Sequence, residues 1–221
     1  NMKMGKGWKL SAQESLKQVT LQGLDGTGVT YLLHTDADGT EHYFYPVNST
    51  TYQDEDGLGL TITSSGGTEY SMKDEKDNQK IFRRGYLSEI VDRNGNRTVF
   101  LYNTTSYTAG STTWHPTDSG NQLRRIIRVQ DGTTSQIVVA NLEYSGGYLS
   151  AVTDRGGRRT EYSYASGKLT AINHIYDGTE VNYAYNSYSA NGINSDKMIR
   201  AYAGESQQGI QYVYNENTGG I

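Results

Sequence analysis

The feature that most constrains this chain is a repeated segment that ends in tyrosine. The clearest copy is GYLSAVTDRGGRRTEYSY, residues 147–164, and its neighbours are GYLSEIVDRNGNRTVFLY, residues 85–102, and GKLTAINHIYDGTEVNYAY, residues 167–185. The closing tyrosines are Tyr102, Tyr144, Tyr164, Tyr185 and Tyr214, at steps of 42, 20, 21 and 29 residues. A period of 20 to 21 residues, with one double step and one insertion, indicates a stacked array whose units cannot bury their apolar faces alone.

Each copy predicts one β-hairpin. Residues 148–153 are rich in β-branched and aromatic types, and Thr160, Tyr162 and Tyr164 alternate with polar or charged residues, which is the period of a strand. Between them, Asp154-Arg155-Gly156-Gly157 has the composition of a turn. We expect Gly156 to adopt positive φ there, so that valine at this position would be strained.

The composition supports thin β-layers better than a thick apolar core. There are 19 tyrosines and 26 glycines but only 3 phenylalanines and 2 prolines, and hydrophobic residues make up 34% of the chain. Tyrosine buries its ring while its hydroxyl still needs a partner, which suits a sheet with one wet side. No stretch has apolar residues at helical spacing over three turns, so we expect little helix.

The pattern G-x-L-x-x-I/V-x-D-x-x-G-x-x-x-x-Y-x-Y resembles the YD repeat of the Rhs family. That family includes bacterial Rhs and wall-associated repeat proteins, the shells of insecticidal toxin complexes, and teneurins. The resemblance is carried over residues 85–214 and assigns a structural role to turn and tyrosine positions. These positions are Asp92, Arg93, Gly95, Asn96, Tyr102, Tyr144, Asp154, Gly156, Gly157, Tyr162, Tyr164, Asp177, Gly178, Tyr183, Tyr185 and Tyr214.

We therefore predict an all-β fold of consecutive antiparallel hairpins that form a curved, spiralling sheet, an arc of an Rhs-type shell. Residues 1–82 are interpreted as degenerate hairpins that lead into the array. Residues 83–221 are interpreted as the YD-repeat array, with polar inserts at 103–121 and 186–197. Trp8 is expected to pack as an end plug rather than to bind a ligand.

Charge and composition narrow the range of partners. The net charge is −4 without a basic stripe, so nucleic acid is not an expected partner. There is no cysteine, and the longest apolar run, about four residues, is far short of the roughly 20 needed to span a bilayer. The chain opens on Asn1 without a signal peptide, and we interpret it as a piece of a longer protein.

The resemblance implies a structural function. The leading hypothesis is a non-enzymatic segment of an exported bacterial protein, secreted or at the cell surface, whose shell encloses a C-terminal toxin or effector. Its partners would be the rest of the parent array and that cargo. No cofactor, no metal and no catalytic residue is expected.

Two other functions compete with this interpretation. Trp114 and Tyr188 in the inserts could stack on sugars, which would make the chain a surface-glycan or adhesion module. A polysaccharide-directed enzyme would instead need two facing carboxylates in a cleft. The Asp36-Ala37-Asp38-Gly39 stretch has the composition of a calcium loop, but an Asp-Gly turn explains it without a metal. The four histidines show no metal-ligand spacing.

Overall fold

A computed structural model describes residues 3–5, 7–22, 26–109, 121–185, 197–204 and 208–213. Within these ranges the secondary structure is entirely β, so the predicted all-β fold class is confirmed. The strands are β1 (Ser15–Gln22), β2 (Gly28–Thr35), β3 (Glu41–Pro46), β4 (Thr51–Asp54), β5 (Thr61–Gly66), β6 (Glu69–Lys73), β7 (Gln79–Arg83), β8 (Tyr86–Val91), β9 (Arg97–Tyr102), β10 (Leu123–Val129), β11 (Gln136–Ser145), β12 (Tyr148–Asp154), β13 (Arg159–Ala165), β14 (Lys168–His174), β15 (Thr179–Tyr185), β16 (Met198–Ala203) and β17 (Gln208–Gln211).

Consecutive strands pair antiparallel, as the hairpin prediction requires. The pairing runs from β1 to β10 and again from β12 to β17, each strand beside the next in sequence. The turn between β7 and β8 shows how tightly the chain reverses: Arg84 has φ of 50° and Gly85 has φ of 80°. Positive φ at both central residues is the geometry of a type I′ turn, whose twist matches that of the flanking strands.

The chain forms two compact units. Among the described residues, the first comprises those from 10 to 140, and the second comprises those from 3 to 9 and from 141 to 213. The polypeptide passes from the first unit to the second within β11. Each unit is described separately below.

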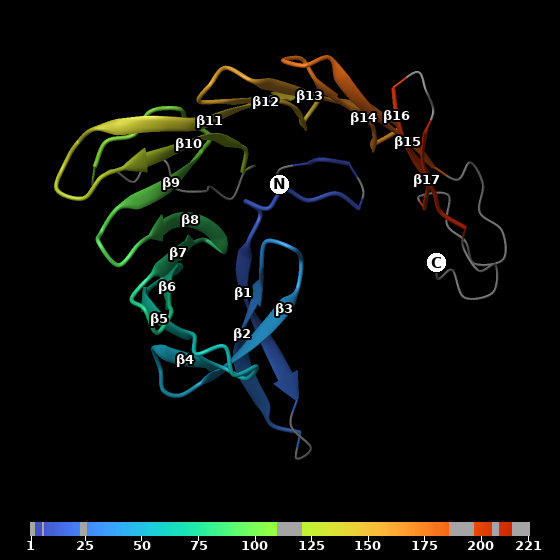
Figure 1. The fold of residues 1–221 in the computed structure, drawn as a ribbon. Coiled ribbons are helices and arrows are strands. Elements are labelled where there is room, and N and C mark those ends of the chain that lie inside the picture. Colours follow the sequence, from blue (N-terminus) through green and yellow to red (C-terminus); the bar gives the residue numbers. More distant parts are fainter. Residues whose placement is uncertain are drawn as a thin grey trace. The chain divides into compact units, whose positions relative to one another are not determined.

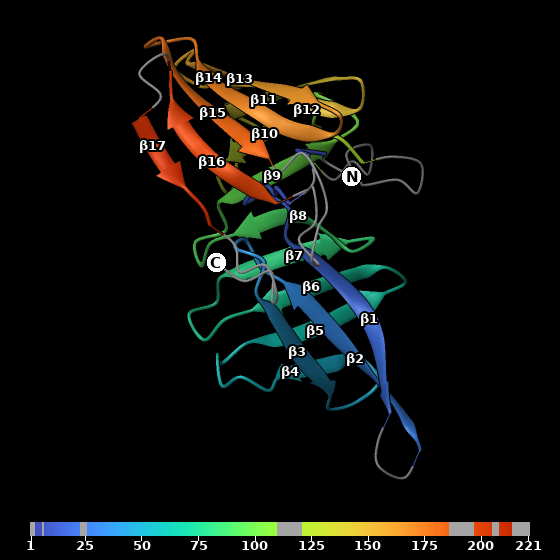
Figure 2. The same ribbon diagram turned by 90° about the vertical axis from the view of Figure 1, so that its right-hand side faces the viewer.

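The first unit closes its sheet on itself. Ser15 in β1 pairs with Tyr86 in β8, while β1 also pairs along its length with β2. Leu16 N–H donates to the Gly85 carbonyl at 3.0 Å, and Leu87 N–H donates to the Glu14 carbonyl at 3.3 Å. In Figures 1 and 2 the blue strands β1–β3 therefore stand opposite the green strands of the same unit. This closure gives the inner face a partner surface.

Closure of the sheet buries at least one large apolar side chain from each of the strands β1 to β10. Leu32 faces Phe44 across β2 and β3, Ile62 faces both Tyr52 and Met72, and Phe82 pairs with Leu87. Phe44, Ile62 and Phe82 have no exposed surface. Each such side chain contributes about 1.5–3 kcal/mol on burial, so this unit has a dry core. A second cluster gathers Val99, Leu101, Ile127 and Val129 from β9 and β10.

The second unit is built from the hairpins β12–β17 and a segment from the N-terminal end of the chain. Residues 3–9, which we call the strap, pass beside the start of β12: Lys3 and Tyr148 form a parallel bridge, and Leu149 N–H donates to the Lys3 carbonyl at 2.8 Å. Met4, on the strap, is 5% exposed. The repeat leucines Leu149 and Leu169 are fully buried, whereas most side chains of β13 and β15 are half-buried.

Candidate functional site

The Asp-Gly turn of each repeat is a closed hydrogen-bonded loop. In the loop of residues 154–158, Asp154 N–H donates to the Arg158 carbonyl and Gly157 N–H donates to the Asp154 carbonyl, both at 3.0 Å. One carboxylate oxygen of Asp154 accepts from the backbone N–H groups of Gly156 at 2.8 Å and Arg158 at 3.0 Å. The aspartate thus supplies acceptors for donors that the strand ladder leaves unpaired.

The left-handed residue of this loop is Gly157, with φ of 79°, and not Gly156. The expectation that Gly156 needs positive φ is therefore wrong. Gly156 is the third residue of the turn that begins at Asp154, and φ is negative at this position of a type I turn. Only the fourth residue, Gly157, adopts positive φ.

The loop of residues 92–96 repeats this arrangement. Asp92 accepts from the N–H groups of Asn94 and Asn96 at 2.8 and 3.0 Å, and the Asn96 side-chain amide donates to its other carboxylate oxygen at 2.8 Å. Gly95 has φ of 85°. The Asn96 side chain lowers the pKa of Asp92, as Arg158 lowers that of Asp154, because each donates to the ionised carboxylate. Both carboxylates are therefore ionised at neutral pH.

Two further copies of the loop lie in the first unit, one of them at Asp36, where an Asp-Gly turn was expected from the sequence. Asp36 accepts from the N–H groups of Asp38, Gly39 and Thr40. Asp74 accepts from Lys76 and Asn78, and here the left-handed residue is Asp77, with φ of 67°. Aspartate tolerates this conformation better than most side chains, so the shared signal is D-x-x-G/D rather than Asp-Gly.

Neighbouring loops in the first unit are joined by the amide at the fifth loop position. Asn78 Oδ1 accepts from Arg93 N–H in the next loop along the edge, and Asn96 Oδ1 accepts from Asp131 N–H in the loop after that, each at 3.2 Å. Through these hydrogen bonds, the Arg93 backbone and the Asn96 side chain link adjacent hairpins. Asp177 and Gly178 form a different loop, in which Gly178 N–H donates to the His174 carbonyl and Asp177 accepts from Thr179.

Three of the closing tyrosines make the same contact. The hydroxyls of Tyr102, Tyr164 and Tyr185 donate to the carbonyls of Leu87, Leu149 and Leu169, respectively, at 2.9, 2.7 and 2.7 Å. Each acceptor is the buried leucine that opens the same repeat. These tyrosines were predicted from the repeat but their leucine partners were not, although the fixed spacing from Gly-x-Leu to the tyrosine was the available signal.

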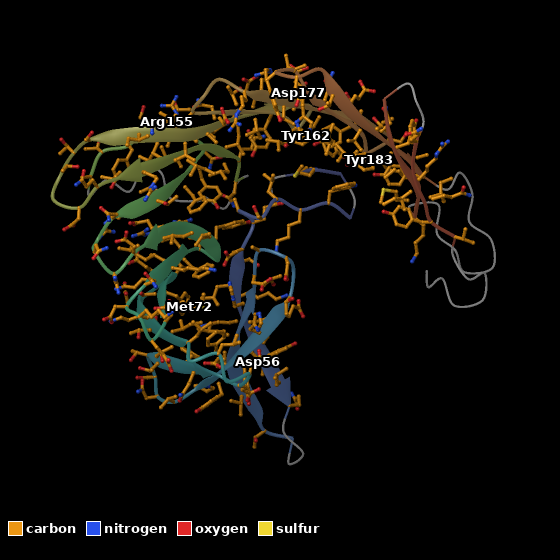
Figure 3. The ribbon with its side chains drawn as sticks, in the orientation of Figure 1. Asp56, Met72, Arg155, Tyr162, Asp177 and Tyr183 are labelled. Carbon is orange, nitrogen blue, oxygen red and sulfur yellow. The ribbon has the colours of Figure 1, made fainter. Side chains whose placement is uncertain are left out.

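Two further repeat tyrosines, Tyr162 and Tyr183, lie on the same side of the second unit's sheet. Figure 3 shows Tyr162 and Tyr183 on one side of it, with Arg155 and Asp177 at the turns. Burial raises the pKa of both tyrosines above the ordinary value, so their hydroxyls stay protonated. Tyr144, in β11, is half-buried.

The strap reaches this tyrosine layer through Trp8. The indole N–H donates to the Tyr185 hydroxyl at 2.9 Å, and the indole ring meets Tyr183 edge-on with centroids 4.7 Å apart. Gly5 packs so closely on the chain that a Cβ there would lie 2.7 Å from Leu169 N. The tyrosine hydroxyl of the repeat therefore serves as both donor and acceptor, linking Trp8 to the Leu169 carbonyl.

Several sequence candidates lie outside the described residues. These are Tyr214, Trp114 and Tyr188, with most of the inserts 103–121 and 186–197. Within the described ranges no group of three or more His, Cys, Asp or Glu side chains could hold a metal ion. A search of the same residues finds no helix able to cross a membrane.

Comparison with known proteins gives weak but consistent relationships. No protein-family model matches the chain. The chain is 26% identical over 199 residues to the tRNA nuclease WapA of Bacillus subtilis (strain 168), and 26% identical over 200 residues to the tRNA3(Ser)-specific nuclease WapA of Bacillus spizizenii. Each match spans 89% of this chain but only 8% of the relative's own length. These matches support an Rhs-type relationship at a coarse level.

Two solved structures are similar at lower identity. A TcdB2-TccC3 crystal structure without its hypervariable C-terminal region matches 91% of this chain and 11% of its own, with 13% identity and a TM-score of 0.46. The Photorhabdus luminescens Tc holotoxin pore matches 84% of this chain and 11% of its own, with 14% identity and a TM-score of 0.43.

The relatives correct one expectation. The sequence analysis expected no enzymatic activity, yet the curated relatives are named tRNA nucleases, so that expectation is contradicted. The glycan hypothesis receives no support from the same comparisons.

Proposed function

We propose that this chain is a wall segment of a longer, exported Rhs-type toxin protein, in which repeated hairpins enclose a nuclease or other toxic cargo. The observation that carries the proposal is the recurrence of one set of contacts: an aspartate-capped loop on one edge and a tyrosine hydroxyl bonded to the opening leucine carbonyl. A unit that bonds its own ends can be added repeatedly with little change.

The WapA similarity supports placing an activity elsewhere in the parent protein. The matched region is 8% of those relatives, so most of their length lies outside it. The role of the described residues would be to separate cargo from solvent until release. Export and the identity of the cargo belong to the same proposal.

The proposal is tested on the full-length parent protein. We expect the intact parent to show little tRNA cleavage and to protect its C-terminal part from added protease, and we expect mild denaturant to release both. Native elution beside intact mass under denaturing conditions would show whether the cargo is a separate chain that the wall retains.

A matched pair of variants sharpens this test. Phe82→Asp places a charge in the fully buried core of the first unit, whereas Val47→Asp changes a side chain that is 53% exposed. We expect only Phe82→Asp to release the activity and to expose the cargo to protease. If the unmodified parent already cleaves tRNA fully and its C-terminal part is digested freely, the enclosing role is wrong.

A further inference from the structure

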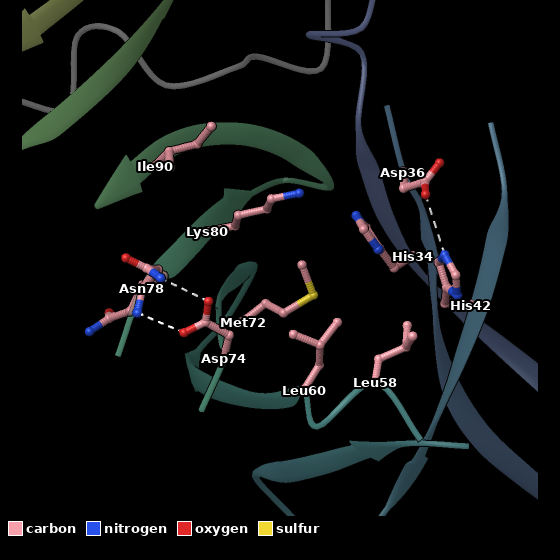
Figure 4. A pocket seen from close by; sticks show the side chains of 11 residues that line it. His34, Asp36, His42, Leu58, Leu60, Met72, Asp74, Asn78, Lys80 and Ile90 are labelled. Carbon is pink, nitrogen blue, oxygen red and sulfur yellow. Dashed lines mark hydrogen bonds and ion pairs between the residues drawn. The ribbon is translucent and has the colours of Figure 1, made fainter. Parts of the chain in front are cut away.

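A cavity of about 250 Å³ lies inside the first unit, and one loop forms part of its wall. Figure 4 shows the lining: His34 and His42 come from β2 and β3, and strands β6, β7 and β8 supply much of the remainder. Leu58 and Leu60 come from residues 55–60, which join β4 to β5 and which we call the cavity loop. The position of this loop therefore determines how much apolar lining the cavity has.

The cavity loop is held near its start and from within. Glu55 N–H donates to the Tyr43 carbonyl in β3 at 3.1 Å. The buried Asp54 carboxylate accepts from the N–H groups of Leu58 and Leu60 at 2.5 and 2.7 Å. Exchange of these two amides with solvent therefore reports whether the loop keeps its folded form.

A side-chain contact ties the loop to β3 through His42. The Nδ1 atom of His42 lies 2.8 Å from Oδ2 of Asp56, in the loop. Its Nε2 atom lies 3.4 Å from Oδ2 of Asp36, in the turn between β2 and β3 (Figure 4). A carboxylate only accepts hydrogen bonds, and a neutral imidazole carries a single N–H. Both contacts can be hydrogen bonds at once only when the ring is the cation.

The same contacts favour the charged ring. The hydrogen bond to Asp56 raises the pKa of His42 above its ordinary value, partial burial opposes this, and the bond to Asp36 adds to the increase. Burial by itself would raise the pKa of Asp36, but its hydrogen bonds outweigh burial and hold that pKa well below the ordinary value. A histidine whose folded pKa is raised stabilises its contacts fully below its unfolded pKa, about 6.5, and loses this contribution as the pH rises through the folded value.

Other charged groups near the ring leave this direction unchanged. His34, in β2, stacks on His42 with ring centroids 6.0 Å apart. His34 contacts Glu14, which also pairs with Lys80 of β7. Asp74, between β6 and β7, lines the same cavity. These two carboxylates offset the positive charge of Lys80 and, when it is protonated, that of His34, so the surroundings do not disfavour a cation at His42.

We propose that His42 is a pH-dependent clip on the cavity loop: the protonated ring holds Asp56 and keeps Leu58 and Leu60 against the cavity, and loss of the proton to solvent frees the loop. The cavity then opens as the pH rises, whereas the strands around it stay folded. This device does not depend on the wall function proposed above.

Hydrogen exchange of the purified chain tests the clip. Between about pH 6 and about pH 9, we expect the protection of the Leu58 and Leu60 amides, corrected for the intrinsic effect of pH, to fall about threefold. The effect is modest because the Asp56 side chain is 49% exposed, and solvent screens such a pair. The amides of β6 should keep their protection, and the ring of His42, followed by nitrogen-15 NMR, should titrate with the same midpoint as the loop.

Two variants break the clip in different ways. His42→Gln cannot titrate, so protection of the loop should be low at every pH. Asp56→Asn changes an exposed side chain, so the chain should fold normally, the midpoint of His42 should fall and the pH dependence of the loop should largely disappear. The matched change His174→Gln, in the second unit, where the ring contacts the Thr160 hydroxyl, should alter neither the midpoint nor the loop.

Three results would overturn the clip. The first is protection of the loop that does not change with pH in the unmodified chain. The second is a pH dependence that persists undiminished in Asp56→Asn. The third is an equal loss of protection in the loop and in β5–β7, which would mean that the whole unit opens.

Discussion

The two units of this protein solve the same problem with different chemistry. Both are runs of antiparallel hairpins with one face to bury. The first unit closes β1 on β8 and fills the interior with fully buried side chains such as Phe44, Ile62 and Phe82. The second leaves a half-buried tyrosine layer and places the strap against it through Trp8. The difference shows that the repeat specifies a hairpin, whereas the surrounding structure determines how completely the packed face of that hairpin is buried.

The comparison predicts its largest effect in the closed core. Phe82→Ala should lower the free energy of unfolding by about 3–5 kcal/mol, because it leaves a cavity that the closed sheet cannot collapse. Tyr183→Ala, in the half-buried layer, should cost less than half as much. Urea denaturation of the purified variants measures both, and equal losses would mean that the two inner faces are equally packed.

The strap should stabilise the second unit alone. Trp8→Ala removes an edge-on ring contact and a hydrogen bond, so we expect local stability to fall by about 2 kcal/mol. Hydrogen exchange should accelerate in β14 and β15 and stay unchanged in β5–β7. Gly5→Ala should reproduce this pattern because its Cβ would lie 2.7 Å from Leu169 N. Acceleration spread evenly over both units would contradict a local role for the strap.

A pair of neighbouring glycines tests the loop shared by the units. Gly157→Ala should cost about 1 kcal/mol, since alanine is strained at φ of 79°, whereas Gly156→Ala should be nearly neutral. Gly95→Ala in the first unit should cost more than Gly157→Ala, because its Cβ would also meet the Asp131 side chain at 2.7 Å. Thermal melts of the three variants give the order, and a larger loss at Gly156 would refute the loop assignment.

The smallest expected effect is a loss of folding stability at acidic pH. The pKa values of Asp74 and Asp92 in the first unit, and of Asp154 and Asp177 in the second, are held below the ordinary value by hydrogen-bond donors. A carboxylate whose folded pKa is lowered stabilises the fold above its unfolded pKa, about 3.9, and loses that contribution as the pH falls. Stability should thus decrease below about pH 4 in both units.

The variant Asp154→Asn keeps an acceptor oxygen but cannot titrate. Its unfolding free energy should depend less on pH between 2 and 5 than that of the unmodified chain, a range set by the ordinary aspartate pKa of about 3.9. Denaturation curves at a series of pH values measure the slope. An unchanged slope would mean that this loop carboxylate does not contribute to acid sensitivity.

The sequence determined the local parts of this protein. The tyrosine period and the D-x-x-G spacing predicted hairpins, their turns and the all-β class, because register and loop geometry depend on residues close together in the chain. The same reasoning placed positive φ at Gly156 instead of Gly157, and it did not identify Asp77 as the left-handed residue of the turn that begins at Asp74. These errors are of one or two positions and reflect how little separates adjacent turn residues in composition.

Only the tertiary structure decided which surfaces meet. The pairing of Ser15 with Tyr86, the seating of Trp8 on Tyr183, and the buried Glu14, His34 and Lys80 cluster join residues 71, 175 and up to 66 positions apart. No periodicity encodes such contacts, because they depend on how far the twisted sheet curls before its ends meet. The sequence therefore settled what each hairpin is, and the closure of the first unit's sheet between β1 and β8 settled where its core lies.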